Sequence, residues 1–307
     1  TGLGHGELIA RHATPVVRTT WLPMLIAGEL TGIAVTERHG GSRVREVTTR
    51  LVPAVGGGYR LVGEKCWISR LDEAAVFVVF AKDPMGRVAA AVIDGANPGL
   101  HRFPQQPVGL SGWSWGGLRL DSVRVTEEQL LGTPGTGLTI FRDHFAHYRP
   151  MVTATALGTA AGVHDAVCAH LASRQARYEI TRVRDTAMVT IGRMFAGINA
   201  ALLACLHAQR LSADQQPSAD LWGRVAKAYG VDTAYQAVSE LILLVGAAGF
   251  RFGHWMDKAK RDLNGLLYAD GMHDSLYRSG GRTLLAMPVR DDGADVADKR
   301  IEGQRGA

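Results

Sequence analysis

The chain has 307 residues, 46% of them hydrophobic, and a net charge of +5, so it can bury a large core in two or three packed units. No run approaches the roughly 18 uninterrupted apolar residues that span a bilayer, and the first residues lack the order of a signal peptide. We therefore expect a cytoplasmic protein with no membrane partner.

The three cysteines, Cys66, Cys168 and Cys205, are odd in number and widely spaced. This spacing predicts neither a disulfide framework nor a metal site. The basic residues are dispersed and not interleaved with aromatic ones, so no nucleic-acid partner is predicted. The positive charge instead suits an acidic partner, such as a CoA phosphate or an acidic carrier protein.

Taken in chain order, residues 1–28 are predicted to form the end of a larger helical unit, with one helix from Gly6 to Thr20. The pattern then changes to short apolar runs separated by Gly, Pro and Asn turns. This pattern predicts an antiparallel β-domain over 29–130, with strands among the runs 59–69, 76–81, 88–93 and 118–125.

After Pro134 and Gly135 the apolar residues recur at three- and four-residue steps, which is the period of amphipathic helices. Residues 135–289 are therefore predicted to form an antiparallel four-helix bundle, with helices near 136–176, 179–212, 218–247 and 256–287. The stretch 290–307 is charged and rich in glycine, and we expect it to be a disordered tail.

Two short turns carry the most specific pattern in the chain. Each follows an apolar extended run and can offer backbone N–H groups and hydroxyls to one flat polar ligand. The first turn contains Thr36, Glu37, Gly41 and Ser42, and the second contains Gly63, Lys65, Trp67, Ile68 and Ser69. Either turn alone is a weak signal because Gly, Ser and Thr fill turns in many β proteins, but the ordered pair is specific.

This pair resembles the two flavin-contacting segments of the acyl-CoA dehydrogenase family, with Arg38 and Arg43 in place of the family's Pro and Asp. The resemblance implies an α+β fold, in which an antiparallel β-barrel-like middle domain precedes a four-helix up-down bundle. It also makes residues 1–28 the remnant of an N-terminal helical domain. The implied cofactor is FAD, bound through Thr36, Gly41, Ser42, Trp67, Ile68 and Ser69.

Two further matches lie in the predicted bundle. Gly246 and Gly249, followed by Arg261 and Asp262, resemble the family's loop against the adenosine side of FAD across a dimer interface. Arg174 matches the family arginine that contacts the pyrophosphate of the partner's FAD, a task that suits a planar guanidinium. The resemblance thus implies that Arg174 and Gly246 bind the cofactor of a second subunit in a homodimer or homotetramer.

Asp270, counted without a gap from Asp262, stands where many family members carry their catalytic Glu, which removes the α-proton of an acyl thioester. Other relatives place the base where Tyr148 stands, but a tyrosine with its ordinary pKa near 10 is a poor base. His273 belongs to a segment that resembles one in flavin-dependent monooxygenases of the same fold. The catalytic candidates are therefore Asp270 and His273, and no metal ligands are predicted.

The resemblance implies an FAD-dependent dehydrogenase of acyl-CoA or acyl-carrier-protein thioesters. The departures from the family at Arg38, Arg43, Leu243 and Ala269 suggest a specialised substrate, and we expect a carrier-protein thioester of secondary metabolism. The electron acceptor of the enzyme would be an electron-transfer flavoprotein or oxygen. Two alternatives stay open, namely a flavin-dependent monooxygenase that uses His273, and a catalytically inactive homologue or interaction subunit.

Overall fold

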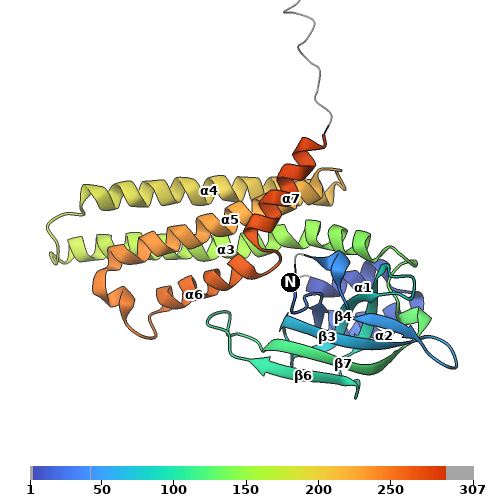
Figure 1. Cartoon of the computed structure of the whole chain (residues 1–307). Helices are drawn as coiled ribbons and strands as arrows, with labels where there is room; N and C mark the ends of the chain where they lie inside the picture. The colour runs from blue at the N-terminus through green and yellow to red at the C-terminus, as the bar shows by residue number, and fades with distance from the viewer. Residues whose placement is uncertain (1–2, 42, 288–307) are drawn as a thin grey trace, which may run out of the picture.

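A computed structural model describes residues 3–41 and 43–287. A sheet domain lies against one end of a long helical bundle (Figure 1). Two of the sequence predictions, the cofactor contact of Ser42 and the tail 290–307, lie outside the described residues.

The chain begins with the short turn η1 (Gly4–Gly6) and the helices α1 (Glu7–His12) and α2 (Pro15–Ile26). The predicted single helix from Gly6 to Thr20 is therefore wrong. Thr14 interrupts it as the N-cap of α2, and its hydroxyl accepts a hydrogen bond from Val17 N. Pro15, at the first helical position, has no N–H that would need a partner there, so the sequence favours a new helix start at this point.

Seven strands form one sheet in the order β1-β4-β2-β3-β7-β6, with β5 also paired to β4. The strands are β1 (Leu30–Ala34), β2 (Arg50–Pro53), β3 (Tyr59–Ser69), β4 (Ala74–Lys82), β5 (Val88–Asp94), β6 (Leu100–Gln105) and β7 (Trp115–Val125), with 3-10 turns η2 (Val44–Glu46) and η3 (Glu127–Gln129) between them. β4 runs parallel to β1 and β2, and the other pairs are antiparallel. The expected α+β class is confirmed, but the sheet is mixed because β4 returns beside β1 after the intervening β2–β3 hairpin.

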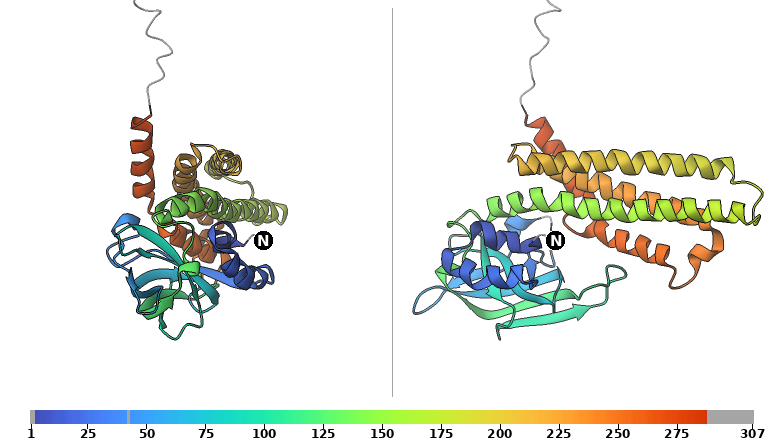
Figure 2. Two further views of the ribbon diagram at one scale, coloured as in Figure 1. Left: turned by 90° about the vertical axis from the view of Figure 1, so that its right-hand side faces the viewer. Right: turned by 180° about the vertical axis from the view of Figure 1, so that it is seen from behind.

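β4 contributes to two cores because successive side chains of a strand point to opposite faces. Phe77 and Val79 pack into a core that is built from β3, β6 and β7. Val78 and Phe80 face the other way, toward a second core that includes α1, α2 and the start of the long helix α3. Figure 2 shows the two N-terminal helices, α1 and α2, between the sheet and α3. The bundle therefore contacts the sheet domain partly through these two helices.

The helical part consists of α3 (Gly137–Ala176), α4 (Asp185–Ala213), α5 (Ala219–Leu241), the 3-10 segment η4 (Ile242–Phe250), α6 (Trp255–Tyr268) and α7 (His273–Leu285). Helices α3, α4 and α5 share one apolar core with α6. The predicted helix 256–287 is two helices, since Asp270 and Gly271 adopt φ angles of 56° and 114°. Only glycine takes such angles without strain, so Gly271 supplies the sequence reason for the break.

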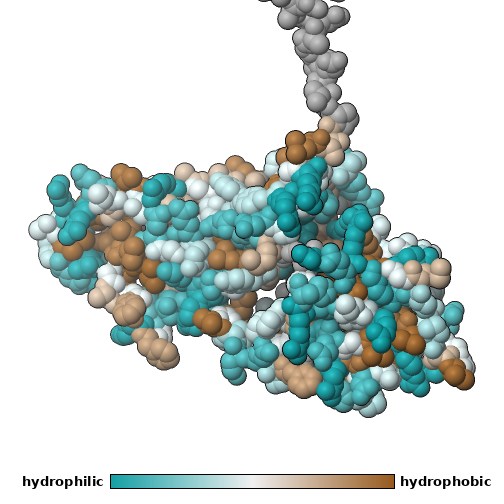
Figure 3. All heavy atoms as spheres, in the orientation of Figure 1, coloured by the Kyte–Doolittle hydropathy of each residue, from teal (hydrophilic) through white to brown (hydrophobic). Residues whose placement is uncertain are grey.

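By length and composition alone, 185–213 and 219–250 could each cross a membrane. Core helices of a bundle pass the same test, and α5 packs against both α3 and α4 in this structure. Figure 3 shows apolar side chains scattered among polar ones along the bundle.

The loop between β6 and β7 reaches out of the sheet to α6 (Figure 1). Leu110 N donates to Asp262 Oδ1 at 2.7 Å, and Arg261 Nη1 donates to Val108 O at 2.9 Å. A Cβ at Gly109 would lie 2.3 Å from Arg261 O, so only glycine allows this close approach. Arg261 and Asp262, which belong to the segment that resembles the family, therefore join the bundle to the sheet domain.

Candidate functional site

Trp67 lies at an irregularity of β3, where the pairing with β7 shifts register between Lys65 and Ile68. Its φ of 62° lies in the left-handed region, which is unusual for a bulky residue. The indole stacks on Trp115 with ring centroids 5.0 Å apart, yet Trp67 keeps 52% of its surface exposed. The bulge thus presents one aromatic face to solvent at the end of the strand.

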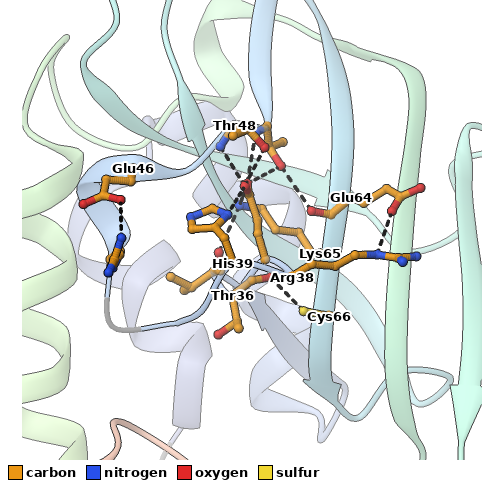
Figure 4. A network of polar contacts seen from close by, with 12 residues as sticks. Thr36, Arg38, His39, Glu46, Thr48, Glu64, Lys65 and Cys66 are labelled. Atoms are coloured by element: carbon orange, nitrogen blue, oxygen red, sulfur yellow. Dashed lines mark hydrogen bonds and ion pairs between the residues drawn. The ribbon is translucent and has the colours of Figure 1, made fainter. Parts of the chain in front are cut away.

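A buried ion pair between Lys65 and Glu37 joins the two predicted cofactor turns (Figure 4). Lys65 Nζ donates to Glu37 Oε1 at 2.8 Å and to Val35 O at 3.0 Å. Glu37 also accepts hydrogen bonds from the backbone N–H and hydroxyl of both Thr48 and Thr49. Burial by itself would raise the pKa of Glu37, but the hydrogen bonds from Lys65, Thr49 and Thr48 lower it to about 2. The carboxylate therefore stays charged and holds the end of β1 against β3.

The other residues of the two cofactor turns differ in how far they are exposed to a ligand. A Cβ at Gly41 would lie 2.7 Å from Thr36 Oγ1, so the glycine lets the loop fold back onto Thr36. Ser69 is exposed and available to a ligand. Ile68 is 2% exposed and belongs to the sheet core, so its side chain does not reach a ligand and only its backbone remains for the predicted contact.

A cleft of about 520 Å³ opens beside Trp67 on the outer surface of β3, β6 and β7. Aromatic side chains and charged groups of both signs line it, among them Arg38, Glu64, Trp67, Phe103 and Arg119. A flat aromatic ligand with a polar tail matches this lining, because such sites combine apolar faces with a few polar groups.

The helical half of the site centres on the Asp270 turn (residues 269–272), which joins α6 to α7. Arg149 of α3 is buried and donates from Nε to Asp270 O at 3.0 Å. Lys227 of α5 donates from Nζ to Gly271 O at 3.1 Å. Two cations from two helices thus hold consecutive carbonyls of the turn and leave the Asp270 carboxyl free.

The carboxyl of Asp270 titrates in an unusual environment. Burial raises its pKa, and the nearby charges of Lys227 and Arg149 oppose that rise. Burial, together with the charge of Asp270, raises the pKa of Tyr148 to about 12. Tyr148 therefore stays protonated at neutral pH, which favours Asp270 over Tyr148 as the base.

His273, the first residue of α7, uses both of its ring nitrogens inside the protein. Nε2 accepts from Lys227 Nζ at 2.9 Å, and Nδ1 donates to Asp232 Oδ1 at 2.6 Å. Burial and the charge of Lys227 lower the pKa of His273, so the neutral ring with its proton on Nδ1 fits both contacts. This arrangement favours a positioning role for His273 over the direct role expected of it in a monooxygenase.

Sequence reasoning missed the group of rings that faces Tyr148. His5 Nδ1 lies 2.9 Å from His144 Nε2, and the rings of His5 and Tyr148 lie 4.3 Å apart. Burial lowers the pKa of both histidines, to about 3 for His144, so the pair is neutral. Among the described residues, no group of three His, Cys, Asp or Glu side chains is placed to hold a metal ion.

Lys227, Asp232 and the histidine pair were not among the predicted site residues. Lys227 had a signal in the sequence, since it is the one charged residue in the otherwise uncharged helical stretch 225–231. The contact of His5 with His144 had none, because the two residues are 139 positions apart.

The end of α3 and the segment η4, which contain Arg174 and Gly246, lie at the far end of the bundle, away from the sheet (Figure 1). Arg174 lies in the last turn of α3 and is paired with Glu179 at 3.2 Å, while Gly246 has a φ of 75° within η4. The structure therefore brings these two residues to the same end of the bundle but not to Trp67 or Asp270 of the same chain.

Two family models match the chain. The middle domain of acyl-CoA dehydrogenase matches residues 32–123, and the C-terminal domain of acyl-CoA dehydrogenase matches residues 135–285. A probable acyl-CoA dehydrogenase, fadE25 of Mycobacterium bovis, is 26% identical over 266 residues, which are 85% of this chain and 68% of that protein.

Solved structures agree with these matches in fold. A glutaryl-CoA dehydrogenase from Mycobacterium smegmatis in complex with FADH2 superposes with a TM-score of 0.83 at 21% identity, covering 93% of this chain and 74% of that one. The prolyl acyl carrier protein oxidase AnaB superposes with a TM-score of 0.82 at 22% identity, covering 92% and 76%. Because both of its domains match, the chain belongs to the acyl-CoA dehydrogenase family of FAD-dependent oxidoreductases that act on CH–CH groups.

Proposed function

We propose that this protein dehydrogenates an acyl thioester between its α and β carbons, with Asp270 as the base. The observation that carries the proposal is the Asp270 turn, in which Arg149 and Lys227 hold the backbone and leave a partly buried carboxyl free. Because burial raises the pKa of this carboxyl, its basicity is closer to what proton abstraction at neutral pH requires.

The cofactor residues support the same reaction. The exposed indole of Trp67, the hydroxyl of Ser69 and the closely packed Thr36 and Gly41 suit a flat ring system with polar edges. FAD bound there would accept the β-hydrogen with its electron pair. The residues of this chain do the rest: Asp270 takes the α-proton, the thioester stays intact, and the carbon–carbon bond becomes double.

The proposal also concerns the carrier to which the acyl group is attached as a thioester. The net charge of +5 favours an acidic carrier, either the phosphates of CoA or an acidic carrier protein, through electrostatic steering. The similarity in fold to an acyl carrier protein oxidase is consistent with the second choice. The electron acceptor of the reaction would be an electron-transfer flavoprotein or oxygen.

A second copy of the chain also belongs to the proposal. The last turn of α3, which carries Arg174, and η4, which contains Gly246, belong to the end of the bundle remote from the sheet, so these residues would meet a cofactor only in a homodimer or homotetramer. Leu243, Phe250 and Phe252 beside Gly246 are 74%, 95% and 100% exposed, which suits a surface that a second subunit covers.

An anaerobic visible spectrum tests the proposal. The purified protein is loaded with FAD and mixed with a panel of acyl-CoA and acyl-carrier-protein thioesters, alongside the Asp270→Asn variant. We expect one thioester to bleach the flavin band in the wild type, and to do so at least ~100-fold more slowly in the variant. Bleaching that persists in the variant would exclude Asp270 as the base. A protein that binds no flavin would support the inactive homologue.

A further inference from the structure

Lys227 is fully buried in the middle of α5, at 0% exposure. A buried ammonium is costly unless its three N–H donors find acceptors. Nζ donates to Leu266 O at 2.9 Å, to Gly271 O at 3.1 Å and to His273 Nε2 at 2.9 Å. All three donors are therefore used.

These three acceptors surround the Asp270 turn. Leu266 belongs to the last turn of α6, Gly271 lies within the Asp270 turn, and His273 begins α7. One side chain thus ties the end of one helix, the turn and the start of the next helix to a single point on α5. This matters because Asp270 and Gly271 both hold left-handed φ angles, a conformation that persists only where its surroundings fix it.

The imidazole of His273 is held from its other side. Asp232, one turn further along α5, accepts from Nδ1 at 2.6 Å and from the Tyr277 hydroxyl at 3.4 Å. Its side chain is 48% exposed, so the chain of contacts runs from solvent at Asp232 through His273 to the buried ammonium. Within the described residues, no carboxylate forms an ion pair with Lys227. Its charge is met by carbonyl and imidazole dipoles, and Asp270 is not drawn into a salt bridge.

Resting on the proposed function, we propose that Lys227 is the positioning residue of the base, fixing the Asp270 turn with His273 and Asp232 as its support. The charged and titratable groups that face Asp270 are Lys227 on α5 and Tyr148 and Arg149 on α3. The two cations oppose the rise in the pKa of Asp270 that burial causes. Lys227 therefore fixes the position of the Asp270 carboxylate and also lowers its basicity.

The test compares Lys227→Met with the wild type, both loaded with FAD, using the thioester that bleaches the flavin. We expect kcat to fall about 10- to 100-fold with little change in KM, because a small misplacement of a reacting group costs about this much. The acid limb of the kcat/KM profile should move to higher pH, since one of two cations beside Asp270 is gone. Amide hydrogen exchange in a peptide that spans 266–276 should become faster, and this readout does not depend on flavin.

Arg224→Met is the matched control. Arg224 lies one turn before Lys227 on α5 and also bonds α7, through the hydroxyls of Ser279 and Thr283, but none of its hydrogen bonds reaches the Asp270 turn. Its removal should lower stability without moving the acid limb or the exchange of 266–276. If Lys227→Met does not fold, Asp232→Asn replaces it, because Asp232 holds His273 from its other side. In that variant kcat should fall and amide exchange in 266–276 should become faster, while the acid limb should not move to higher pH, because both cations beside Asp270 remain.

An acid limb and an exchange rate that stay at wild-type values in a folded Lys227→Met protein would overturn the positioning role, as would wild-type values of kcat and of the exchange rate in Asp232→Asn. So would equal changes in Arg224→Met, which would mean that any loosening of α5 against α7 has this effect. The proposed function fails by a different result, namely Asp270→Asn with wild-type turnover.

Discussion

Within residues 3–41 and 43–287, one lysine is buried in each of the two parts of the protein, and the two lysines are used in opposite ways. Lys65 in the sheet domain is paired directly with the Glu37 carboxylate at 2.8 Å. Lys227 in the bundle donates to two carbonyls and an imidazole. Burial lowers the pKa of both lysines, to about 8 for Lys227, while hydrogen bonds and the charge of Glu37 counter part of the effect at Lys65.

This difference between the two lysines sets the role of the carboxylate beside each of them: Glu37 is structural, and Asp270 is available for chemistry. Glu37, with its pKa near 2, cannot take a proton at neutral pH, and it holds the two cofactor turns together. Within residues 3–41 and 43–287 Asp270 forms no ion pair, and burial raises its pKa against the opposing charges of Lys227 and Arg149, so its carboxyl is better able to take a proton. A close salt bridge to Lys227 would have removed this capacity.

The largest predicted effect on stability comes from Lys65→Met. The variant leaves the Glu37 carboxylate buried without its cation, and breaking a buried pair in this way costs about 3–5 kcal/mol. Urea unfolding measures the loss. Lys227→Met serves as the comparison and should lose less, about 1–3 kcal/mol, because it leaves neutral acceptors unpaired and not a carboxylate. Equal losses in the two variants would contradict the distinction drawn here.

The Lys65–Glu37 ion pair also predicts how the free energy of unfolding depends on pH. The pKa of Glu37 falls from about 4.5 to about 2 on folding, so its contribution is complete above pH 4.5 and is lost as the pH falls toward 2. Unfolding free energies of the wild type and of Glu37→Gln, measured between pH 5 and pH 3, should therefore converge as the pH falls. Parallel curves would show that Glu37 does not carry this dependence.

Asp262 connects the two regions, and its removal should have a smaller effect. Asp262→Ala deletes the acceptor of Leu110 N, which lies at 2.7 Å, and we expect a loss of about 1–2 kcal/mol by thermal or urea unfolding. Asp214→Ala is the control, because Asp214 is paired only with exposed Arg210 at 3.7 Å and should change little. A control loss as large as that of Asp262→Ala would argue against a specific joint at Leu110.

The smallest predicted effect concerns the cofactor. Trp67→Ala removes the exposed half of the Trp67–Trp115 stack, and we expect FAD to bind about 2- to 10-fold more weakly, since aromatic pairs contribute about 0.5–1.5 kcal/mol. Flavin fluorescence titration measures the affinity. Trp113→Ala, in the β6–β7 loop and outside the cleft, should bind FAD as the wild type does.

The sequence predicted what local pattern and motif encode. The apolar run of β4, the start of the long helix near 136 and the paired turns at Thr36 and Trp67 indicated the α+β class, the family and the oxidoreductase class, all of which are confirmed. The domain boundaries, the individual site residues and the cytoplasmic location stay predictions.

Several features of the structure could not be predicted from the sequence because they depend on contacts between segments that are far apart in the chain. The parallel pairing of β1 with β4 and the meeting of His5 with His144 leave no local trace. The break at Gly271 was hidden because apolar residues continue on both sides of it. Lys227 was overlooked because a single charge in a helical stripe can equally point to solvent, and only packing shows that it is buried.

Proton abstraction by Asp270 is tested most directly without hydride transfer. The FAD-loaded protein is incubated anaerobically in D₂O with an acyl thioester that has α-hydrogens and no β-hydrogens, and deuterium at the α carbon is followed by mass spectrometry. We predict α-deuteration by the wild type and a loss of at least ~100-fold in Asp270→Asn. Exchange that continues at the wild-type rate in Asp270→Asn would contradict the assignment of the base.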